Sequence, residues 1–312
     1  MVAWTPRTVL FGAALAFSFV VSGAPWSMVE VAWAQEQTLF MAFTDADGAP
    51  VSDMTPEEII IQWDEMPSEV RRIEPINWPA RVTVFVDNAT ESQTVLPDMR
   101  EGLRLFLEAL PADIEVAIAT IAGRPQFRVE HTTDRGALAD AVGALASEGG
   151  AATFFDALYE EAERLDDDDD REYLSVIVMV AVAGSEGSGQ ARGQNLERMM
   201  DRLYDNAAVV HTLLLPSPVS GVTGTQGRPQ TRWGTDIAAA TRGTFADLNI
   251  ATDYRTRLPE LVNDISRRHR LTSHQFRVTY RPPEEASDQP RVQVGSARPG
   301  ITVWPTDNGN IP

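Results

Sequence analysis

A short apolar stretch followed by a polar loop decides the fold of this sequence: residues 82–86 read VTVFV, and residues 87–92 read DNATES. Valine, threonine and phenylalanine favour strands, and a brief apolar run bounded by polar residues is typical of a buried strand. Open α/β sheets hold their ligands outside the carboxyl ends of their parallel strands. Asp87, directly after the strand, would stand at that edge. This stretch therefore predicts an α/β sheet and marks its ligand-facing end.

Similar strands and regular helical stripes continue downstream. Further apolar runs occupy residues 114–121, 176–182 and 209–215. Apolar residues also recur at spacings of three and four, which is typical of one buried helix face. These stripes cover residues 99–110, 138–145 (after the candidate N-cap Asp134), 155–165, 196–204 and 258–265. The alternation predicts the α/β class, with a doubly wound and mostly parallel sheet between helices.

β-structure is predicted on both sides of this region. Residues 37–77 contain several short strand candidates, and residues 273–280 and 291–294 alternate between apolar and polar side chains. We expect the two flanks to meet and form a small β-rich unit. The expected organisation is a signal peptide at 1–34, an N-terminal β flank at 35–78, an α/β domain at 79–270 and a C-terminal β flank at 271–312.

The amino terminus resembles an export signal. Arg7 precedes an apolar run at residues 9–21, and Ala32-Trp33-Ala34 suits cleavage before Gln35. The run is shorter than the roughly 20 residues of a membrane-spanning helix. Export to the periplasm or beyond is therefore predicted, with an uncleaved N-terminal anchor as the alternative. No later stretch is long and apolar enough to span a bilayer, so no membrane span is expected in the mature chain.

The composition excludes several functions. The sequence has no cysteine and no lysine, and its 26 basic residues are all arginine. A disulfide framework, a thiol nucleophile, a P-loop lysine and a Schiff-base lysine are therefore excluded. The formal net charge of −19 excludes the basic surface that nucleic acids and anionic membranes require. No nucleophile, base and orienting residue form a recognisable set, so an enzyme is not expected.

Several segments together resemble a von Willebrand factor A domain, in particular the bacterial secreted VWFA-related group. The strand and loop at 82–92 are one such segment, and GGAATFFDAL at 149–158 is similar to the family pattern G-G-T-x-L-Y-D-A-L. Residues 243–245, 276–282 (like Y-x-x-x-Y-x-P) and 43–51 (like D-x-x-G-x-P-V) extend the resemblance over nearly all of the mature chain. The resemblance implies a Rossmann-like fold and a role in protein interaction.

Such domains commonly carry a metal-ion-dependent adhesion site, in which oxygen ligands from three loops hold Mg²⁺. The family supplies an aspartate and two hydroxyls from D-x-S-x-S, a threonine from a second loop and an aspartate from a third. Asp87 matches the first aspartate. The other four matched positions read Ala89, Glu91, Ala152 (with Thr153 adjacent) and Ala183. The resemblance therefore implies a degenerate site.

Two interpretations follow. The leading one is an exported, metal-independent interaction module with a protein partner at the cell envelope and no cofactor. The alternative is a cation-dependent adhesin, in which a register shift rebuilds a weak site for Mg²⁺, Mn²⁺ or Ca²⁺. The residues of that weak or vestigial site would be Asp87, Thr90, Glu91, Ser92, Thr153 and Glu186.

Under the leading interpretation, the rim at the carboxyl end of the sheet meets the partner. It comprises residues 87–92, 150–153, 183–189 and the Gly/Ser/Thr/Pro-rich loop 216–234. Its expected contact residues are Asp87, Asn88, Glu91, Thr153, Ser185 and Glu186. Asp87 and Glu91 would accept hydrogen bonds there from arginine or lysine side chains of the partner.

Other polar clusters are interpreted structurally. The aspartate run 166–170 has no EF-hand spacing and fits a solvated turn. The four histidines lack zinc-ligand spacing, and we expect His269 and His274 to lie at the surface. The basic stretch 267–270 is expected to favour the helix macrodipole at a helix C-terminus without a specific partner.

Overall fold

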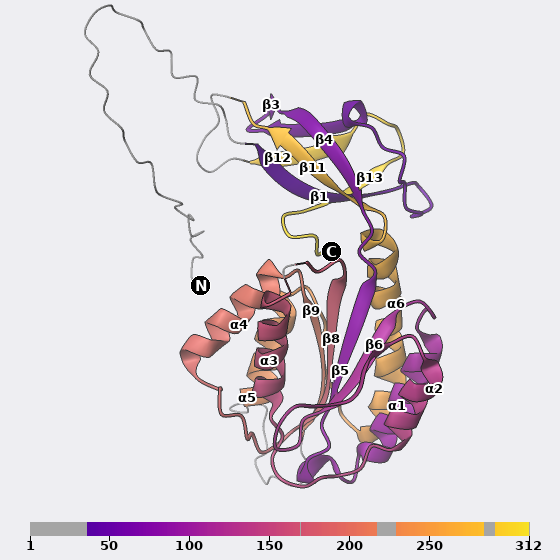
Figure 1. Cartoon of the computed structure of the whole chain (residues 1–312), viewed down its shortest axis with the longest axis vertical. Helices are drawn as coiled ribbons and strands as arrows, with labels where there is room; N and C mark the ends of the chain where they lie inside the picture. The colour runs from indigo at the N-terminus through magenta and orange to yellow at the C-terminus, as the bar shows by residue number, and fades with distance from the viewer. Residues whose placement is uncertain (1–35, 169, 217–228, 284–290, 312) are drawn as a thin grey trace, which may run out of the picture. The chain divides into compact units, whose positions relative to one another are not determined.

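Six strands form the central sheet of the protein (Figure 1). The computed structural model describes residues 36–168, 170–216, 229–283 and 291–311. The strands, in the order in which they pair, are β10 (Phe245–Asp247), β9 (Val209–Pro216), β8 (Leu174–Ala183), β5 (Ala80–Val86), β6 (Glu115–Thr120) and β7 (Gln126–Thr132). All neighbours pair in parallel except β6 and β7, which are antiparallel. The predicted doubly wound, mostly parallel sheet is therefore confirmed.

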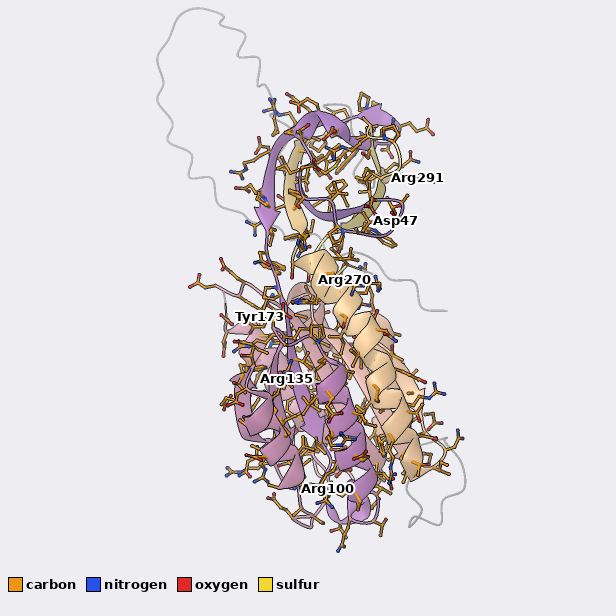
Figure 2. The ribbon with its side chains drawn as sticks, turned by 90° about the vertical axis from the view of Figure 1, so that its right-hand side faces the viewer. Asp47, Arg100, Arg135, Tyr173, Arg270 and Arg291 are labelled. Atoms are coloured by element: carbon orange, nitrogen blue, oxygen red, sulfur yellow. The ribbon has the colours of Figure 1, made fainter. Side chains whose placement is uncertain are left out.

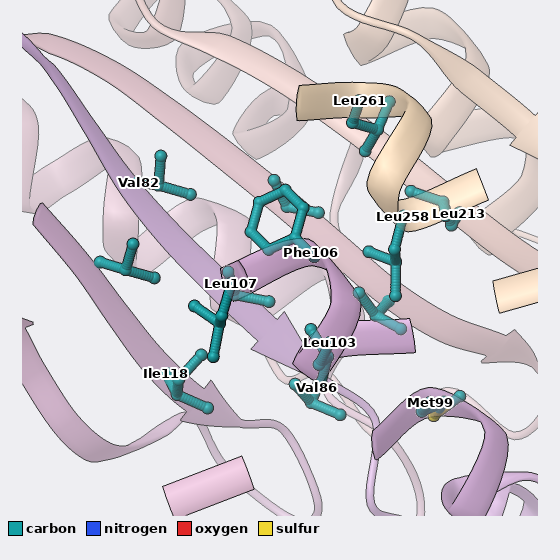
Figure 3. Packing of buried hydrophobic residues seen from close by; sticks show 14 of the residues in the cluster. Val82, Val86, Met99, Leu103, Phe106, Leu107, Ile118, Leu213, Leu258 and Leu261 are labelled. Carbon is teal, nitrogen blue, oxygen red and sulfur yellow. The ribbon is translucent and has the colours of Figure 1, made fainter. Parts of the chain in front are cut away.

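In the described part of the chain, helices cover both faces of this sheet (Figure 1). On one face lie α1 (Leu96–Ala109), α2 (Arg135–Gly143) and α6 (Tyr254–Thr272); on the other lie α3 (Phe154–Asp166), α4 (Gly193–Asp205) and α5 (Pro229–Ala240). Because side chains alternate along a strand, Val82 points into the first layer and Phe85 into the second. Figure 3 shows Phe106 and Leu258 packed in the first of these cores.

The helices α1 and α6 approach each other closely at Gly102. A Cβ at this position would lie 2.5 Å from the backbone oxygen of Tyr254. Glycine is therefore needed here because the two helices approach closely. The backbone of Gly102 does not adopt the left-handed conformation that would be the other reason for a glycine.

Strands from the two ends of the chain pair with each other, as the sequence predicts. The N-terminal strands are β1 (Gln37–Thr44), β2 (Ile59–Trp63), β3 (Met66–Pro67) and β4 (Glu69–Ile76); the C-terminal ones are β11 (Gln275–Arg281), β12 (Val292–Ser296) and β13 (Thr302–Thr306). They form a four-stranded antiparallel sheet, β13-β1-β11-β4, and a three-stranded sheet, β12-β2-β3. Phe43, Ile61 and Phe276 lie in the hydrophobic core of this β-rich unit.

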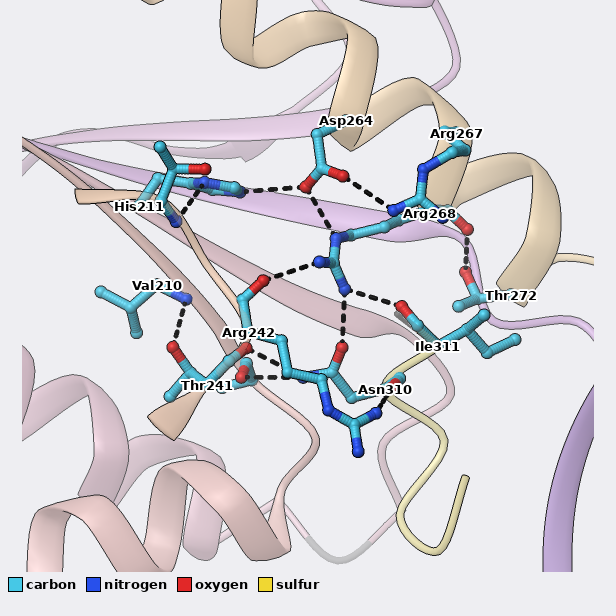
Figure 4. A network of polar contacts seen from close by, with 12 residues as sticks. Val210, His211, Thr241, Arg242, Asp264, Arg267, Arg268, Thr272, Asn310 and Ile311 are labelled. Carbon is cyan, nitrogen blue, oxygen red and sulfur yellow. Dashed lines mark hydrogen bonds and ion pairs between the residues drawn. The ribbon is translucent and has the colours of Figure 1, made fainter. Parts of the chain in front are cut away.

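The basic end of α6 differs from its prediction. Arg268 is 3% exposed and therefore buried, and it has specific partners, whereas the sequence analysis expected none for this stretch. Its guanidinium donates to Asp264, to the side-chain oxygen of Asn310 and to the backbone oxygens of Ile311 and Arg242 (Figure 4). Arg268 thus ties the C-terminal segment to the α/β region. The sequence did not reveal this because Asn310 is 42 residues away.

His269 is likewise a structural residue. Its Nδ1 accepts a hydrogen bond from the Ala80 N–H at 3.0 Å, and its Nε2 lies 3.0 Å from a carboxylate oxygen of Asp113. His269 is thus half-buried and hydrogen-bonded on both ring nitrogens, whereas His274 is exposed, as predicted.

Three further segments complete the comparison with the prediction. Residues 229–234 belong to helix α5, although the sequence suggested that they end a loop; the rest of that loop, from 217 to 228, lies outside the described residues. The predicted signal peptide, residues 1–34, also lies outside them. Within the described ranges, no helix is long and apolar enough to cross a membrane.

Candidate functional site

Three loops meet at the carboxyl edge of the sheet, where β5 and β8 lie side by side. They are residues 87–92 after β5, residues 149–153 before α3, and residues 183–189 after β8. The chain continues from β5 into α1 on one face and from β8 into α4 on the other. This is a topological switch point, the place where open α/β sheets bind ligands.

Asp87 is buried in this crevice, with only 1% of its surface exposed. Its Oδ1 accepts a hydrogen bond from the Ala89 N–H at 2.8 Å, and its Oδ2 accepts one from the Val182 N–H at 3.1 Å. Burial raises the pKa of Asp87, although these hydrogen bonds act in the opposite direction. The carboxylate therefore holds the ends of β5 and β8 together.

Glu91 spans from the first loop to the third. Its Oε1 accepts hydrogen bonds from the Ser185 N–H at 3.0 Å and from the Ser185 hydroxyl at 2.6 Å. The carboxylate lies over Gly184, where an added Cβ would be 1.7 Å from Glu91 Oε2. The glycine therefore leaves the space that the carboxylate occupies.

The second loop is held by backbone contacts to both of the others. The Thr90 N–H donates to Gly150 O at 3.2 Å, and the Gly187 N–H donates to Ala152 O at 2.7 Å. Thr153, at the start of α3, donates its hydroxyl to Ile121 O at 2.9 Å. All three loops are thereby linked by hydrogen bonds.

The remaining predicted residues also have partners within the site. The Ser92 hydroxyl donates to Ala89 O at 2.8 Å. Glu186 Oε1 accepts from the Ser188 N–H at 3.0 Å, and burial raises the pKa of Glu186. Among the described residues, no three His, Asp or Glu side chains are grouped as metal ligands.

The predicted rim is only partly exposed. Asp87, Asn88 and Thr153 are 1–2% exposed, so the expectation that they contact a partner directly does not agree with the structure. Their polar groups instead hold the loops. The surface of the site belongs to Thr90, Gly150, Ser185 and Gly187, which are exposed, together with the half-buried Glu91 and Glu186.

Two residues that the sequence did not indicate anchor the third loop. Asp156, in the first turn of α3, accepts hydrogen bonds from the Gly189 and Gln190 N–H groups at 2.8 and 2.9 Å. Gln230, in α5, donates its amide to Gly184 O at 3.1 Å. Asp156 falls within segment 149–158, which resembles the family pattern, so the sequence could have indicated its role. No sequence pattern indicated a role for Gln230, because it lies in the stretch interpreted as a loop.

The architecture of this sheet is the one that the resemblance to a von Willebrand factor A domain implies. No protein-family model matches the chain, and no curated protein matches it. Similar solved structures include von Willebrand factor type A from Catenulispora acidiphila, with 10% identity, a TM-score of 0.47 and coverage of 88% of this chain and 73% of that one. An aerotolerance-related membrane protein from Bacteroides fragilis NCTC 9343 has 12% identity and a TM-score of 0.43, covering 59% of this chain and 99% of that one.

A third similar structure is BatB from Bacteroides thetaiotaomicron, described as a conserved hypothetical protein. Its identity is 12% and its TM-score 0.43, and the match covers 60% of this chain and 98% of that one. At such identities and TM-scores, these similarities carry no conclusion about function.

Proposed function

We propose that this chain is an exported, non-catalytic protein-interaction module that binds a protein partner through the carboxyl-edge rim without a divalent metal ion. The rim is the surface formed by Thr90, Glu91, Gly150, Ser185, Glu186 and Gly187. Export rests on the predicted signal peptide, and the partner is accordingly expected at the cell envelope.

The hydrogen bonds between Glu91 and Ser185 carry the proposal. In a metal-ion-dependent adhesion site, the ion would draw the loops after two neighbouring strands together. Here one carboxylate from the first loop reaches the third loop and accepts two hydrogen bonds from it. Hydrogen bonds to a charged group are stronger than neutral ones, so this link supports a rim that is preorganised without an ion.

The side chains available as metal ligands around Asp87 also support metal independence. The residues aligned with three ligand positions are Ala89, Ala152 and Ala183, whose side chains have no oxygen. Both carboxylate oxygens of Asp87 accept backbone hydrogen bonds. Mg²⁺ requires near-octahedral oxygen coordination. These residues do not fit such an ion.

The charge of the chain indicates the kind of partner. With a net charge of −19, the protein would repel an acidic partner and attract a basic one. Glu91 and Glu186 give the rim two half-buried carboxylates. Arginine or lysine side chains opposite them would raise the association rate and the specificity more than the affinity.

Site-specific photo-crosslinking in the producing cell tests the rim. A photoreactive residue replaces the exposed rim residue Thr90 in one variant and the exposed Arg72, in strand β4 of the β-rich unit, in the control. We expect a discrete crosslinked protein from position 90, unchanged by EDTA, and none from position 72. A crosslink that disappears with EDTA would instead favour the cation-dependent adhesin. Equal crosslinking at both positions would contradict the rim.

Thermal unfolding separates the two interpretations without knowledge of the partner. An ion that binds only the native state at about a hundredfold excess over its dissociation constant adds about 2.7 kcal/mol of stability. We expect no change in melting temperature with Mg²⁺, Mn²⁺ or Ca²⁺ compared with EDTA. A rise that is lost in both Asp87→Asn and Asp87→Ala would show that the loops hold a cation. Asp87→Asn keeps the shape of the buried side chain and so guards against simple misfolding.

A further inference from the structure

Glu161 breaks the apolar stripe of helix α3. The residues of this helix that face the sheet include Phe154, Leu158 and Leu165, all buried, and Glu161 falls in the same row. It is 2% exposed. A buried carboxylate is costly unless it is paired and hydrogen-bonded, and a leucine would complete the core at this position. The fold alone therefore does not account for Glu161.

Polar side chains from three elements meet at this carboxylate. The Thr83 hydroxyl, from β5, donates to Glu161 Oε1 at 2.9 Å, and Arg164 pairs with Oε2. His131 Nε2, at the end of β7, lies 2.9 Å from Thr83 Oγ1. Because the hydroxyl hydrogen goes to Glu161, the imidazole must donate. Burial lowers the pKa of His131 to about 3, so the ring is neutral at physiological pH.

These residues line a cavity of about 460 Å³, a size typical of small-molecule sites. Thr83, His131, Glu161 and Ser175 are among its polar lining residues. The cavity lies at the amino ends of β5 and β8, at the opposite end of these strands from the rim. In Figure 2, Tyr173 marks the cavity end of the α/β region and Arg100, near the start of α1, marks the rim end.

The two arginines in the cavity wall are already engaged. Arg81 Nε lies 3.0 Å from Glu115, and the Arg81 guanidinium stacks over the ring of Tyr173, 4.8 Å from its centre. Arg164 pairs with Glu161 and stacks over the ring of Phe127 at 4.4 Å. Their positive charge is therefore largely compensated.

The uncompensated charge of the cavity is negative. Glu130 and Asp167 line its exposed mouth, and neither forms an ion pair with another described residue. Asp168 contributes a third carboxylate, which accepts the Tyr173 hydroxyl at 3.1 Å. Helix α3 also ends beside the cavity at Asp166, and a helix C-terminus favours cations. Leu165 supplies an apolar wall between the charged groups.

We propose that this cavity binds a small organic cation with a guanidinium or ammonium group on a short alkyl chain. Glu130 and Asp167 would pair with the cationic group, the alkyl chain would lie along Leu165, and the inner hydrogen-bonding set of Thr83, His131 and Glu161 would receive a second polar end. This site is independent of the rim and does not rest on its proposed function.

Titration calorimetry with agmatine as the probe tests the proposal. We expect saturable binding at one site, whereas glutamate and inorganic phosphate should not bind. The double variant Glu130→Gln/Asp167→Asn should weaken agmatine binding about tenfold, since two exposed ion pairs with the ligand are lost. Both substitutions lie at the exposed mouth and leave the buried network intact.

The matched control is Asp170→Asn/Glu172→Gln, which removes the same charge at exposed positions outside the cavity lining. We expect it to bind agmatine as the unaltered protein does. Equal weakening in both double variants, comparable binding of glutamate, or no saturation at millimolar agmatine would overturn the proposal. An arginine-containing tripeptide amide that bound as tightly as agmatine would overturn the assignment to a free small cation.

Discussion

The carboxylate of Glu91 and the backbone and hydroxyl of Ser185 join two loops that are 94 residues apart in sequence. The strands before these loops, β5 and β8, are neighbours in the sheet, so the link closes the crevice between their carboxyl ends. The serine at the corresponding position of the family motif would have a shorter side chain. In this chain the longer glutamate reaches the third loop itself.

The substitution Glu91→Ala should therefore loosen the third loop and lower stability. Two hydrogen bonds to a half-buried carboxylate are lost, and we expect the free energy of unfolding to fall by about 1–2 kcal/mol. Urea denaturation followed by circular dichroism measures the change. The neighbouring exposed Gln93→Ala is the control and should change stability by less than about 0.5 kcal/mol. Equal effects in the two variants would contradict the role of this link.

A glycine-to-alanine substitution at position 184 should break the same link from the other side. The new methyl group would meet the Glu91 carboxylate at 1.7 Å, and the flexible side chain would have to leave. Gly184→Ala should then cost about as much as Glu91→Ala. In the Glu91→Ala background it should cost less than about 0.5 kcal/mol, since the two changes act on one interaction. Additive losses in this double-mutant cycle would show that Gly184 has a separate role.

The sequence predicted most of the α/β region because its helices and strands repeat their buried positions locally. The cap at Asp134 is an example: its carboxylate accepts the Gly136 and Ala137 N–H groups, as a short-range motif should. Helix α5 was missed because its glycine and threonine content resembled a loop. Gly234 is there for packing, since a Cβ would lie 2.9 Å from the Thr212 side chain. Composition does not reveal such an approach.

The arrangement of the candidate site could be predicted only in part. The sequence places Asp87 at the end of β5, yet its burial depends on Val182, which is 95 residues away. The same holds for the buried Glu161, whose partner Thr83 is 78 residues away. The spacing of apolar residues predicted helix α3. It did not show whether Glu161 lies within the buried face of that helix or beside it. Long-range hydrogen bonds decide which polar residues face the solvent.

The neutral state of His131 predicts a pH dependence of stability. Its folded-state pKa of about 3 is below the ordinary histidine value of 6.5, mainly because of burial and secondarily because of Arg81 and Arg164. The unfolded chain therefore binds more protons than the native protein between these values. This contribution to stability is complete above about pH 6.5 and is lost as the pH falls towards 3.

The variant His131→Gln isolates that contribution. Glutamine can still donate to Thr83 but cannot take up a proton. The free energy of unfolding of the variant should therefore fall less between pH 7 and pH 4 than that of the unaltered protein. The difference between the two proteins should change by an amount on the order of 3 kcal/mol, since pH 4 lies about 2.5 units below 6.5 and one pKa unit corresponds to about 1.36 kcal/mol. Urea unfolding at several pH values measures it. Parallel stability profiles would show that His131 is not held neutral. Glu161, whose pKa is raised by burial, is present in both proteins.

Replacing Arg268 should release the C-terminal segment. The substitution Arg268→Met keeps much of the side-chain volume but leaves Asp264, Asn310 and the Ile311 oxygen without their shared donor. Breaking a buried ion pair by removing one partner costs about 3–5 kcal/mol. We expect a loss near the lower end of this range, because Asp264 is 30% exposed and can regain water. The exposed Arg270→Met should change stability by less than about 0.5 kcal/mol.

Combining Arg268→Met with Asn310→Ala tests whether the two residues act as one unit. Asn310 accepts from Arg268 at 2.8 Å and donates to Thr241 O at 3.1 Å, so part of its contribution depends on the arginine (Figure 4). Residues in one hydrogen-bond network show non-additive losses. The double variant should therefore lose less stability than the two single variants together, as measured by urea unfolding. Strict additivity would mean that the arginine and the asparagine hold the C-terminal segment independently.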